Sequence, residues 1–218
     1  MKTGLIQEQS VTFSGPAGTL EGRMANASNH AGGALIMLHP HPLYGGSMHN
    51  AVVDAVILAA QQFGLATLRF NFRGVGRSHG EFSDGVGEAD DVAAALAFLS
   101  QASGSSNLIL VGYSFGASVA LSYCQSPDHG VKHLFLVALP PVLLEDGVSL
   151  EIPEIAKIVL GETDALVPLQ AIKAVLSERA QKSLLQIIPG ADHFFSGKVA
   201  ELKEVFQGLL SEVIPQIR

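Results

Sequence analysis

The sequence predicts a three-layer α/β/α sandwich, in which helices cover both faces of a mostly parallel β-sheet that begins with an antiparallel hairpin. Two observations lead to this prediction. Short apolar runs alternate with helical patterns along most of the 218 residues. Hydrophobic residues make up 48% of the chain and charged residues only 15%, below the usual charged share of about 25%. So little polar surface is typical of strands buried on both faces, as in a parallel sheet between helices.

The hairpin is expected at the start of the chain. Residues 5–13 and 19–25 alternate polar and apolar side chains around the turn at residues 14–18, Ser-Gly-Pro-Ala-Gly. Such alternation indicates two antiparallel strands with one solvated face. The continuous apolar runs that follow indicate strands of a different, fully buried kind.

Six buried strands are predicted after the hairpin. Each run is short, rich in Ile, Leu or Val, and bounded by Gly, Pro or polar residues. We expect them at Ala34–Leu38, Ala66–Phe72, Leu108–Val111, Leu134–Leu139, Ile158–Leu160 and Leu184–Ile188. Helical segments lie between them, so the connections are expected to be right-handed crossovers between parallel strands.

The helical segments have recognisable ends. Residues 50–63 are apolar and Ala-rich and stop before Gly64, which suits a residue just beyond a helix. An acidic first turn precedes a second helix with one apolar face, formed by Val92, Ala95, Leu96 and Leu99. Pro168 suits the first turn of a helix that begins near Leu169. The closing helix has one apolar stripe, formed by Val199, Leu202, Phe206, Leu209, Leu210 and Val213. The pattern predicts one domain over residues 1–218.

Composition excludes several classes of partner. The net charge is −7 and no run of Lys or Arg occurs, so we expect neither a nucleic-acid nor a membrane partner. Cys124 is the only cysteine, which excludes an intrachain disulfide and a cysteine zinc cluster. The first residues lack the apolar segment of a signal peptide. We expect a cytoplasmic protein, either a monomer or a homodimer.

Two segments match the pattern Gly-x-Ser-x-Gly of a nucleophile elbow: residues 112–116, around Ser114, and residues 76–80, around Ser78. An elbow requires a buried strand that ends at the serine and a helix that begins directly after it. Ser114 follows the apolar run 108–111 and precedes the small-residue segment 117–124. Ser78 lies several residues beyond its strand and is followed by a loop. The context therefore predicts Ser114 as the nucleophile.

A serine nucleophile needs a histidine base, which in this architecture follows a later strand. His193 follows the last buried run, at the edge where parallel strands end. His129 and His133 flank the start of a strand, which is the opposite edge. His193 is therefore the predicted base, and activity is expected to fall at acid pH as it becomes protonated.

The third residue should be an acid at another strand end. Asp164 ends the strand segment 158–164, directly before the helix that begins near Pro168, so it is the preferred candidate. Asp146, after the preceding strand, is its rival. Asp192 adjoins His193, and adjacent side chains seldom orient toward one another in such a turn.

The oxyanion hole requires two backbone N–H groups. Phe115, the residue after the nucleophile, should supply one. The loop His39–Gly46 should supply the other, and its prolines have no N–H to donate. His41 is the first available donor, with Leu43 or Tyr44 as the alternatives.

These motifs together resemble the α/β-hydrolase superfamily over nearly the whole chain. The first parallel strand ends in His39-Pro40, similar to the family's His-Gly, and residues 71–78 resemble its glycine-rich turn. Residues 112–116, 161–168 and 190–193 resemble its nucleophile, acid and histidine segments. The likeness is to small bacterial serine hydrolases related to dienelactone hydrolases and prolyl-peptidase-like domains. It implies an α/β-hydrolase fold without a cap domain, because residues 140–157 are too few for a lid. The site should be open, shaped by residues 40–49, 73–88 and 140–155.

We expect an enzyme that hydrolyses small carboxylic esters through Ser114, His193 and Asp164, without cofactor or metal. Thioesterase, lactonase and aminopeptidase-type activity on the same residues remain alternatives. A metal-dependent hydrolase that uses His39-x-His41, or a non-catalytic binding protein with this fold, are alternatives of different classes.

Overall fold

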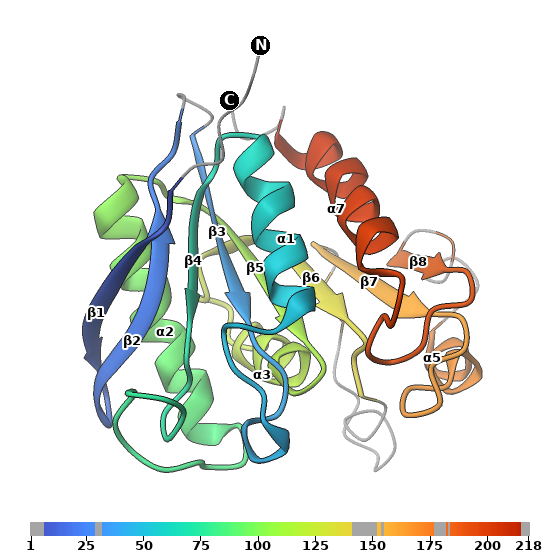
Figure 1. Ribbon diagram of the computed structural model, residues 1–218, viewed down its shortest axis with the longest axis horizontal. Coiled ribbons are helices and arrows are strands. Elements are labelled where there is room, and N and C mark those ends of the chain that lie inside the picture. The colour runs from blue at the N-terminus through green and yellow to red at the C-terminus, as the bar shows by residue number, and fades with distance from the viewer. Residues whose placement is uncertain are drawn as a thin grey trace.

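The computed structural model describes residues 7–28, 32–140, 152–153, 155–176, 182 and 184–214. These residues form an eight-stranded sheet of order β1-β2-β4-β3-β5-β6-β7-β8, with helices on both faces (Figure 1). The predicted α/β/α sandwich is confirmed. The strands are β1 (Gln9–Gly15), β2 (Gly18–Ala25), β3 (Gly33–Leu38), β4 (Ala66–Phe70), β5 (Asn107–Tyr113), β6 (Val131–Val137), β7 (Ala156–Gly161) and β8 (Leu185–Ile188). The helices are the 3₁₀ turn η1 (Pro42–Tyr44), α1 (Ala51–Gln62), α2 (Val86–Ser103), α3 (Phe115–Tyr123), α5 (Leu169–Val175) and α7 (Val199–Val213).

The N-terminal hairpin differs from the prediction in its turn. β1 and β2 pair antiparallel, with Ser14 opposite Thr19 and Gly15 opposite Gly18. Only Pro16 and Ala17 remain in the turn, which is shorter than the predicted residues 14–18. The ladder extends this far because Gly18, at φ +123, adopts a backbone conformation that L side chains rarely take. β2 then pairs antiparallel with β4 and joins the hairpin to the parallel strands.

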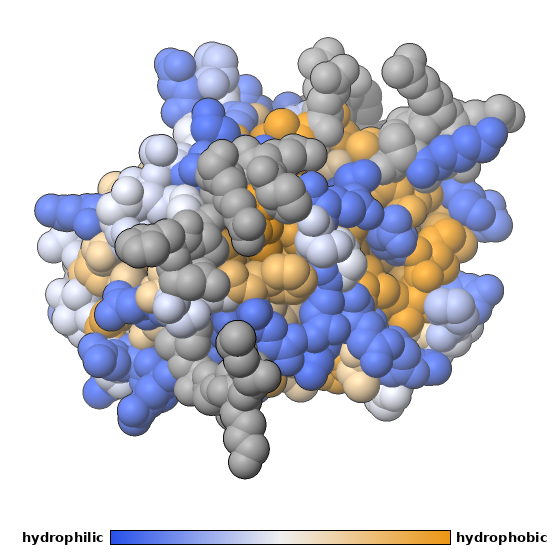
Figure 2. Space-filling model, turned by 90° about the horizontal axis from the view of Figure 1, so that it is seen from above, coloured by the Kyte–Doolittle hydropathy of each residue, from blue (hydrophilic) through white to orange (hydrophobic). Residues whose placement is uncertain are grey.

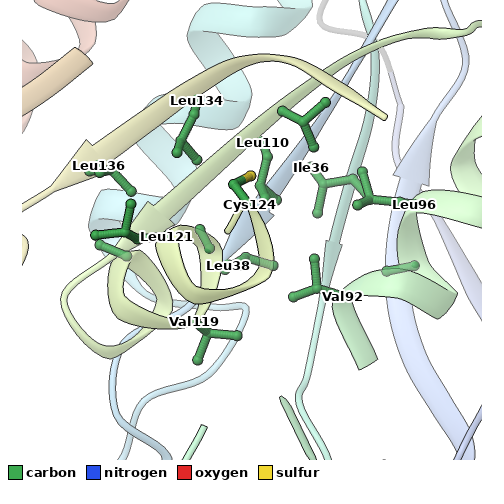
Figure 3. Packing of buried hydrophobic residues seen from close by; sticks show 14 of the residues in the cluster. Ile36, Leu38, Val92, Leu96, Leu110, Val119, Leu121, Cys124, Leu134 and Leu136 are labelled. Atoms are coloured by element: carbon green, nitrogen blue, oxygen red, sulfur yellow. The ribbon is translucent and has the colours of Figure 1, made fainter. Parts of the chain in front are cut away.

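The parallel strands are buried on both faces, which explains their continuous apolar sequence. In β3, Ile36 and Leu38 belong to one core cluster, and Leu35 and Met37 belong to the other. Such alternation follows from the two-residue repeat of a strand. The first cluster packs against α2 and α3 (Figure 3). The second cluster packs against α1 and α7, which lie side by side on the opposite face (Figure 1).

Helix boundaries agree closely with the prediction. Asn50 caps α1, and its side chain accepts a hydrogen bond from the Val52 N–H. The predicted apolar stripe of α7 is buried, except that Val199 is partly buried. α5 begins at Leu169 as expected, but Pro168 is the residue that precedes the helix rather than its first. Among the described residues, no helix is both long and apolar enough to cross a membrane.

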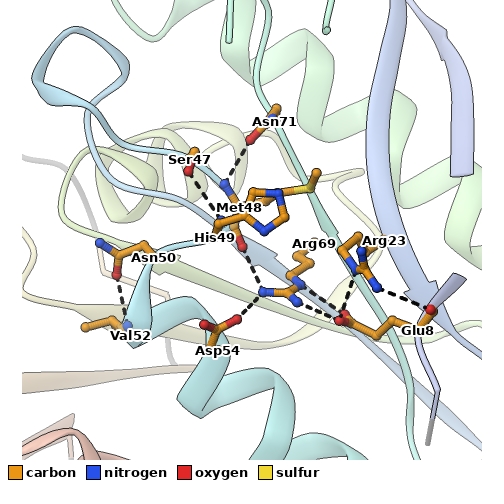
Figure 4. A network of polar contacts seen from close by, with 10 residues as sticks. All are labelled: Glu8, Arg23, Ser47, Met48, His49, Asn50, Val52, Asp54, Arg69 and Asn71. Carbon is orange, nitrogen blue, oxygen red and sulfur yellow. Dashed lines mark hydrogen bonds and ion pairs between the residues drawn. The ribbon is translucent and has the colours of Figure 1, made fainter. Parts of the chain in front are cut away.

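A polar network ties the first segments of the chain to β4 (Figure 4). The buried Arg69 guanidinium donates to the Glu8 carboxylate at 2.6 and 3.0 Å and to the Met48 carbonyl at 3.0 Å, and it also pairs with Asp54 of α1. The Met48 N–H in turn donates to the Asn71 side chain at 2.8 Å. Because Met48 lies in the loop between β3 and α1, this network fixes the far end of the loop that the sequence assigned to the site.

The parallel strands end toward the lower edge of the molecule in Figure 1, where the loops after them gather. Figure 2 looks onto the opposite edge, where hydrophilic residues and apolar patches are interspersed over the described surface. In this architecture, sites form outside the carboxyl ends of the strands. The lower edge is therefore where the predicted residues should meet.

Candidate active site

Ser114 occupies a strained turn between β5 and α3. Its backbone has φ 54 and ψ −116, a combination that a residue with a side chain rarely adopts. Its N–H donates to the Val137 carbonyl at 2.9 Å, which anchors the turn on the neighbouring strand β6. The buried strand before the serine and the helix directly after it are those that the sequence predicted.

Glycine is required on both sides of this serine. A Cβ on Gly112 would lie 2.2 Å from the Gly116 carbonyl oxygen. A Cβ on Gly116 would lie 2.7 and 2.8 Å from the carbonyl oxygens of His39 and Leu38. Both contacts are with backbone, which cannot easily shift. The glycines therefore allow the turn to close on itself and to pack directly against the end of β3.

The structure brings the three predicted side chains together. Ser114 Oγ lies 3.0 Å from His193 Nε2, and His193 Nδ1 lies 2.8 Å from Asp164 Oδ2. The other carboxylate oxygen of Asp164 accepts the N–H groups of Leu166 and Val167 at 2.9 and 2.7 Å. His193 and Asp164 are only 6% and 4% exposed. The arrangement connects a hydroxyl, an imidazole and a fixed carboxylate, as general-base activation of a serine requires.

Tyr113, which the sequence analysis did not single out, holds the histidine loop. Its hydroxyl donates to the His193 backbone carbonyl at 2.9 Å, and burial raises the pKa of the phenol. A buried tyrosine usually places its hydroxyl on a partner. A tyrosine next to Ser114 in a buried strand indicates that its hydroxyl needs a hydrogen-bond acceptor from another segment. The sequence does not indicate which segment supplies that acceptor.

The rival residues have other roles or lie elsewhere. The Asp192 carboxylate accepts the Ser196 N–H at 2.9 Å, within its own turn. The His129 ring accepts the Val131 N–H at the start of β6. His133 lies early in the same strand, and burial lowers its pKa. Asp146 lies outside the described residues.

The two expected oxyanion donors are near one another. The rings of His41 and Phe115 are in contact, with centroids 4.9 Å apart, and both residues line one cleft with Ser114. Within the described chain, no acceptor takes up the backbone N–H of either residue. Both N–H groups are thus available to a ligand at Ser114.

His39 is a buried, fully hydrogen-bonded residue. The Phe72 N–H donates to its Nε2 at 3.1 Å, and its Nδ1 lies 2.6 Å from the Pro40 carbonyl oxygen. Burial lowers the pKa of His39 to about 4, against the opposing hydrogen bond to Pro40. Both ring nitrogens are engaged, so neither offers a free lone pair to a metal as the His39-x-His41 alternative requires. No metal-binding group of three such side chains occurs among the described residues.

The cleft at Ser114 has a volume of about 410 Å³ and a largely apolar lining. Val86, Val119 and Pro140 contribute to its walls beside Phe115, and Ser118 contributes a hydroxyl. All three segments expected to shape the site, 40–49, 73–88 and 140–155, supply lining residues, the last of them through Pro140. Of the third, residues 141–151 and 154 lie outside the described chain.

Comparison with known proteins places the chain in a family. A family model of the α/β-hydrolase fold matches residues 33–153, more than half of the chain. The uncharacterised protein RP471 of Rickettsia prowazekii is 37% identical in an alignment of 211 residues that covers 92% of this chain and 87% of that protein. The chain belongs to the α/β-hydrolase fold family, and the coarse prediction of a hydrolase is confirmed with it.

Solved structures extend the likeness beyond the matched region. XC6422 from Xanthomonas campestris, described as an α/β serine hydrolase without a lid, is 30% identical, with a TM-score of 0.84 and 96% of each chain covered. ATU1826 from Agrobacterium tumefaciens is 33% identical, with a TM-score of 0.84 over 95% of this chain and 97% of that chain. The N-terminal hairpin and the last strand and helix are therefore parts of the shared fold.

Proposed function

We propose that this chain is a serine hydrolase that cleaves small carboxylic esters through an acyl-enzyme intermediate, with Ser114 as nucleophile, His193 as general base and acid, and Asp164 as the residue that orients His193. The observation that carries the proposal is the continuous hydrogen-bonded line from Ser114 Oγ through the imidazole to the Asp164 carboxylate. A serine hydroxyl aligned in this way can lose its proton as it attacks.

The chemistry follows from these contacts. Ser114 Oγ attacks the ester carbonyl carbon while its proton passes to His193 Nε2, and the carbonyl oxygen becomes an oxyanion. The N–H groups of Phe115 and His41 would donate to that oxyanion. His193 then returns the proton to the departing alcohol. A water molecule, deprotonated by His193, then attacks the acyl carbon; the bond from that carbon to Ser114 Oγ breaks, His193 returns the proton to Oγ, and the acid is released.

The apolar cleft favours a neutral acyl ester as substrate. Its walls of Val86, Val119 and Pro140 offer dispersion contacts and no cation to pair with an anionic group. The similarity to XC6422, described as a serine hydrolase without a lid, supports an open site of this kind.

The experiment measures hydrolysis of nitrophenyl acetate, butyrate and octanoate by the unaltered protein and by Ser114→Ala. We expect loss of nearly all turnover, by about 10³-fold or more, with an unchanged circular dichroism spectrum. A fluorophosphonate probe should label Ser114, identified by peptide mass spectrometry, and Ser78→Ala should be labelled as well as the unaltered protein. Full turnover by Ser114→Ala, or labelling at another serine, would contradict the proposal.

A further inference from the structure

Directly after β3 lies a buried histidine that does not line the cleft and that takes no part in the proposed proton transfer. His39 is 0% exposed, and its ring packs edge-on against Phe72 with centroids 4.8 Å apart. Its two hydrogen bonds determine its tautomer. The backbone N–H of Phe72 can only donate, so Nε2 must be the unprotonated acceptor and Nδ1 must carry the hydrogen. The imidazole therefore donates from Nδ1 to the Pro40 carbonyl oxygen, at 2.6 Å.

The same carbonyl is confined from another side by Gly46. A Cβ on Gly46 would lie 2.0 Å from the Pro40 oxygen and 2.5 Å from its carbonyl carbon. Gly46 is further tied to this segment, because its N–H donates to the His41 carbonyl at 3.0 Å. The Pro40 carbonyl is thus held by a hydrogen bond from His39 and by close packing of backbone from Gly46.

A fixed carbonyl also fixes the N–H that follows it. The Pro40–His41 peptide bond is trans, and in a planar trans peptide the C=O and N–H bonds point in opposite directions. Because the Pro40 oxygen faces the buried His39 ring, the His41 N–H points away from that ring. The backbone of His39 packs against Gly116 beside the nucleophile, and His41 lines the cleft there. The free N–H therefore belongs to a residue of the cleft wall that Ser114 also lines.

We propose that His39 is a positioning residue, which together with Gly46 clamps the Pro40 carbonyl and thereby aims the His41 N–H at the oxyanion formed on Ser114. This inference rests on the proposed function. It also gives a reason for proline at position 40. The ring holds φ of Pro40 near about −65°, so ψ of Pro40 is the main torsion left to orient the Pro40–His41 peptide, and the contacts from His39 and Gly46 restrain it.

The test uses two substitutions that each keep one half of the imidazole's hydrogen bonding. The Asn side chain of His39→Asn can place an N–H near the position of Nδ1 and retains the donor to Pro40. The Gln side chain of His39→Gln can place a carbonyl near the position of Nε2 and retains the acceptor for Phe72 only. We expect kcat for nitrophenyl butyrate to fall about 10²-fold in His39→Gln, the usual effect of losing one oxyanion donor. KM should change less than about threefold, and kcat of His39→Asn should exceed that of His39→Gln by about tenfold.

A boronic acid, which forms a tetrahedral adduct on Ser114, gives a second readout. Its Kd should weaken in the same order as kcat falls, whereas a role in stability alone would leave kcat per folded molecule and this Kd unchanged. Equal kcat in the two His39 variants would overturn the proposal.

If the His39 variants do not fold, two glycine variants, Gly46→Ala and Gly45→Asn, test the proposal instead. Gly46→Ala should displace the Pro40 carbonyl and lower kcat, whereas Gly45→Asn should not, because its site has open space and asparagine tolerates φ +81. Equal kcat in these two variants would also overturn the proposal. If the unaltered protein showed neither labelling of Ser114 nor turnover of any ester, the proposed function itself would be refuted instead.

Discussion

The two Gly-x-Ser-x-Gly segments of this chain share one sequence pattern, but their serine hydroxyls have different surroundings. Ser114 lies in a strained turn with its hydroxyl 3.0 Å from an imidazole nitrogen. The Ser78 hydroxyl donates to the Asn71 carbonyl at 2.6 Å and accepts the Glu21 N–H at 3.1 Å. The Ser114 hydroxyl faces an imidazole nitrogen that can accept its proton. The Ser78 hydroxyl is buried, and both of its hydrogen bonds are with backbone groups. The pattern specifies a tight turn at a serine, and the neighbours of the hydroxyl decide whether it can react.

The Ser78 segment serves as a joint between the hairpin and β4. Glu21 accepts hydrogen bonds from the Asn71 side chain and from the backbone and side chain of Arg77, each at 2.8 Å. A few residues away, the partly buried Arg73 forms an ion pair with the buried Asp91 of α2, with a shortest contact of 2.8 Å. These contacts fix the loop 73–88, which lines the cleft, so Ser78 affects the site by supporting a wall.

The largest effect that distinguishes the two regions is expected at Asp164. Replacement by Asn should lower kcat about 10⁴-fold with little change in KM, because an amide favours the wrong tautomer of His193. The matched control is Asp192→Asn, which removes the acid next to His193 in sequence and should leave kcat within about threefold. Steady-state kinetics on nitrophenyl butyrate would measure both. A similar loss in both variants would contradict the assignment of the acid.

A smaller effect is expected from the buried His39 as the pH falls. The pKa of about 4 in the folded protein lies below the ordinary value of 6.5, so the unfolded chain binds the proton more readily. Stability should therefore decrease as the pH falls from about 6.5 toward 4, by about 3 kcal/mol from this group. Urea unfolding at a series of pH values, compared between the unaltered protein and His39→Gln, would measure it. If the free energy of unfolding of His39→Gln fell equally steeply with pH, the pH dependence would come from other groups.

Ser78→Ala should lower stability rather than activity. Its removal leaves the Glu21 N–H and the Asn71 carbonyl each short of one partner, at a cost of about 2 kcal/mol. Chemical denaturation should show the lower free energy of unfolding, while kcat per folded molecule should stay within about threefold. The exposed Ser126 offers a control, since Ser126→Ala should change neither. A large loss of kcat in Ser78→Ala at full folding would mean that the two regions are less distinct than their hydrogen bonds indicate.

The smallest effect is expected at Arg77, whose side chain is 81% exposed. Burial opposes ionisation of Glu21, but its hydrogen bonds from Arg77 and Asn71 outweigh this and lower its pKa. Arg77→Met removes the side-chain contact and keeps the backbone one, so stability at pH 7 should fall by less than about 1 kcal/mol. The difference from the unaltered protein should shrink as the pH falls through the pKa of Glu21, because the protonated acid no longer attracts the cation. Denaturation at pH 7 and pH 3 would show whether it does.

The sequence alone determined which segments form strands and helices, with strand ends displaced by up to four residues from those observed, because apolar runs, alternating patterns and helix-stopping glycines act over a few residues. It also pointed to His193 and Asp164, which the structure places in one hydrogen-bonded line with Ser114, since parallel strands end at one edge and only a few residues of the right type follow them.

Only the tertiary structure decided the contacts that join distant segments. The hairpin turn was predicted too long because strand pairing, not turn composition, set its length. The bond from Tyr113 to the His193 carbonyl, the burial of the Ser78 hydroxyl and the hold of His39 on the Pro40 carbonyl have no local signature. Each depends on which buried donor finds an acceptor once the sheet has formed, and that choice is made by packing rather than by the residues on either side.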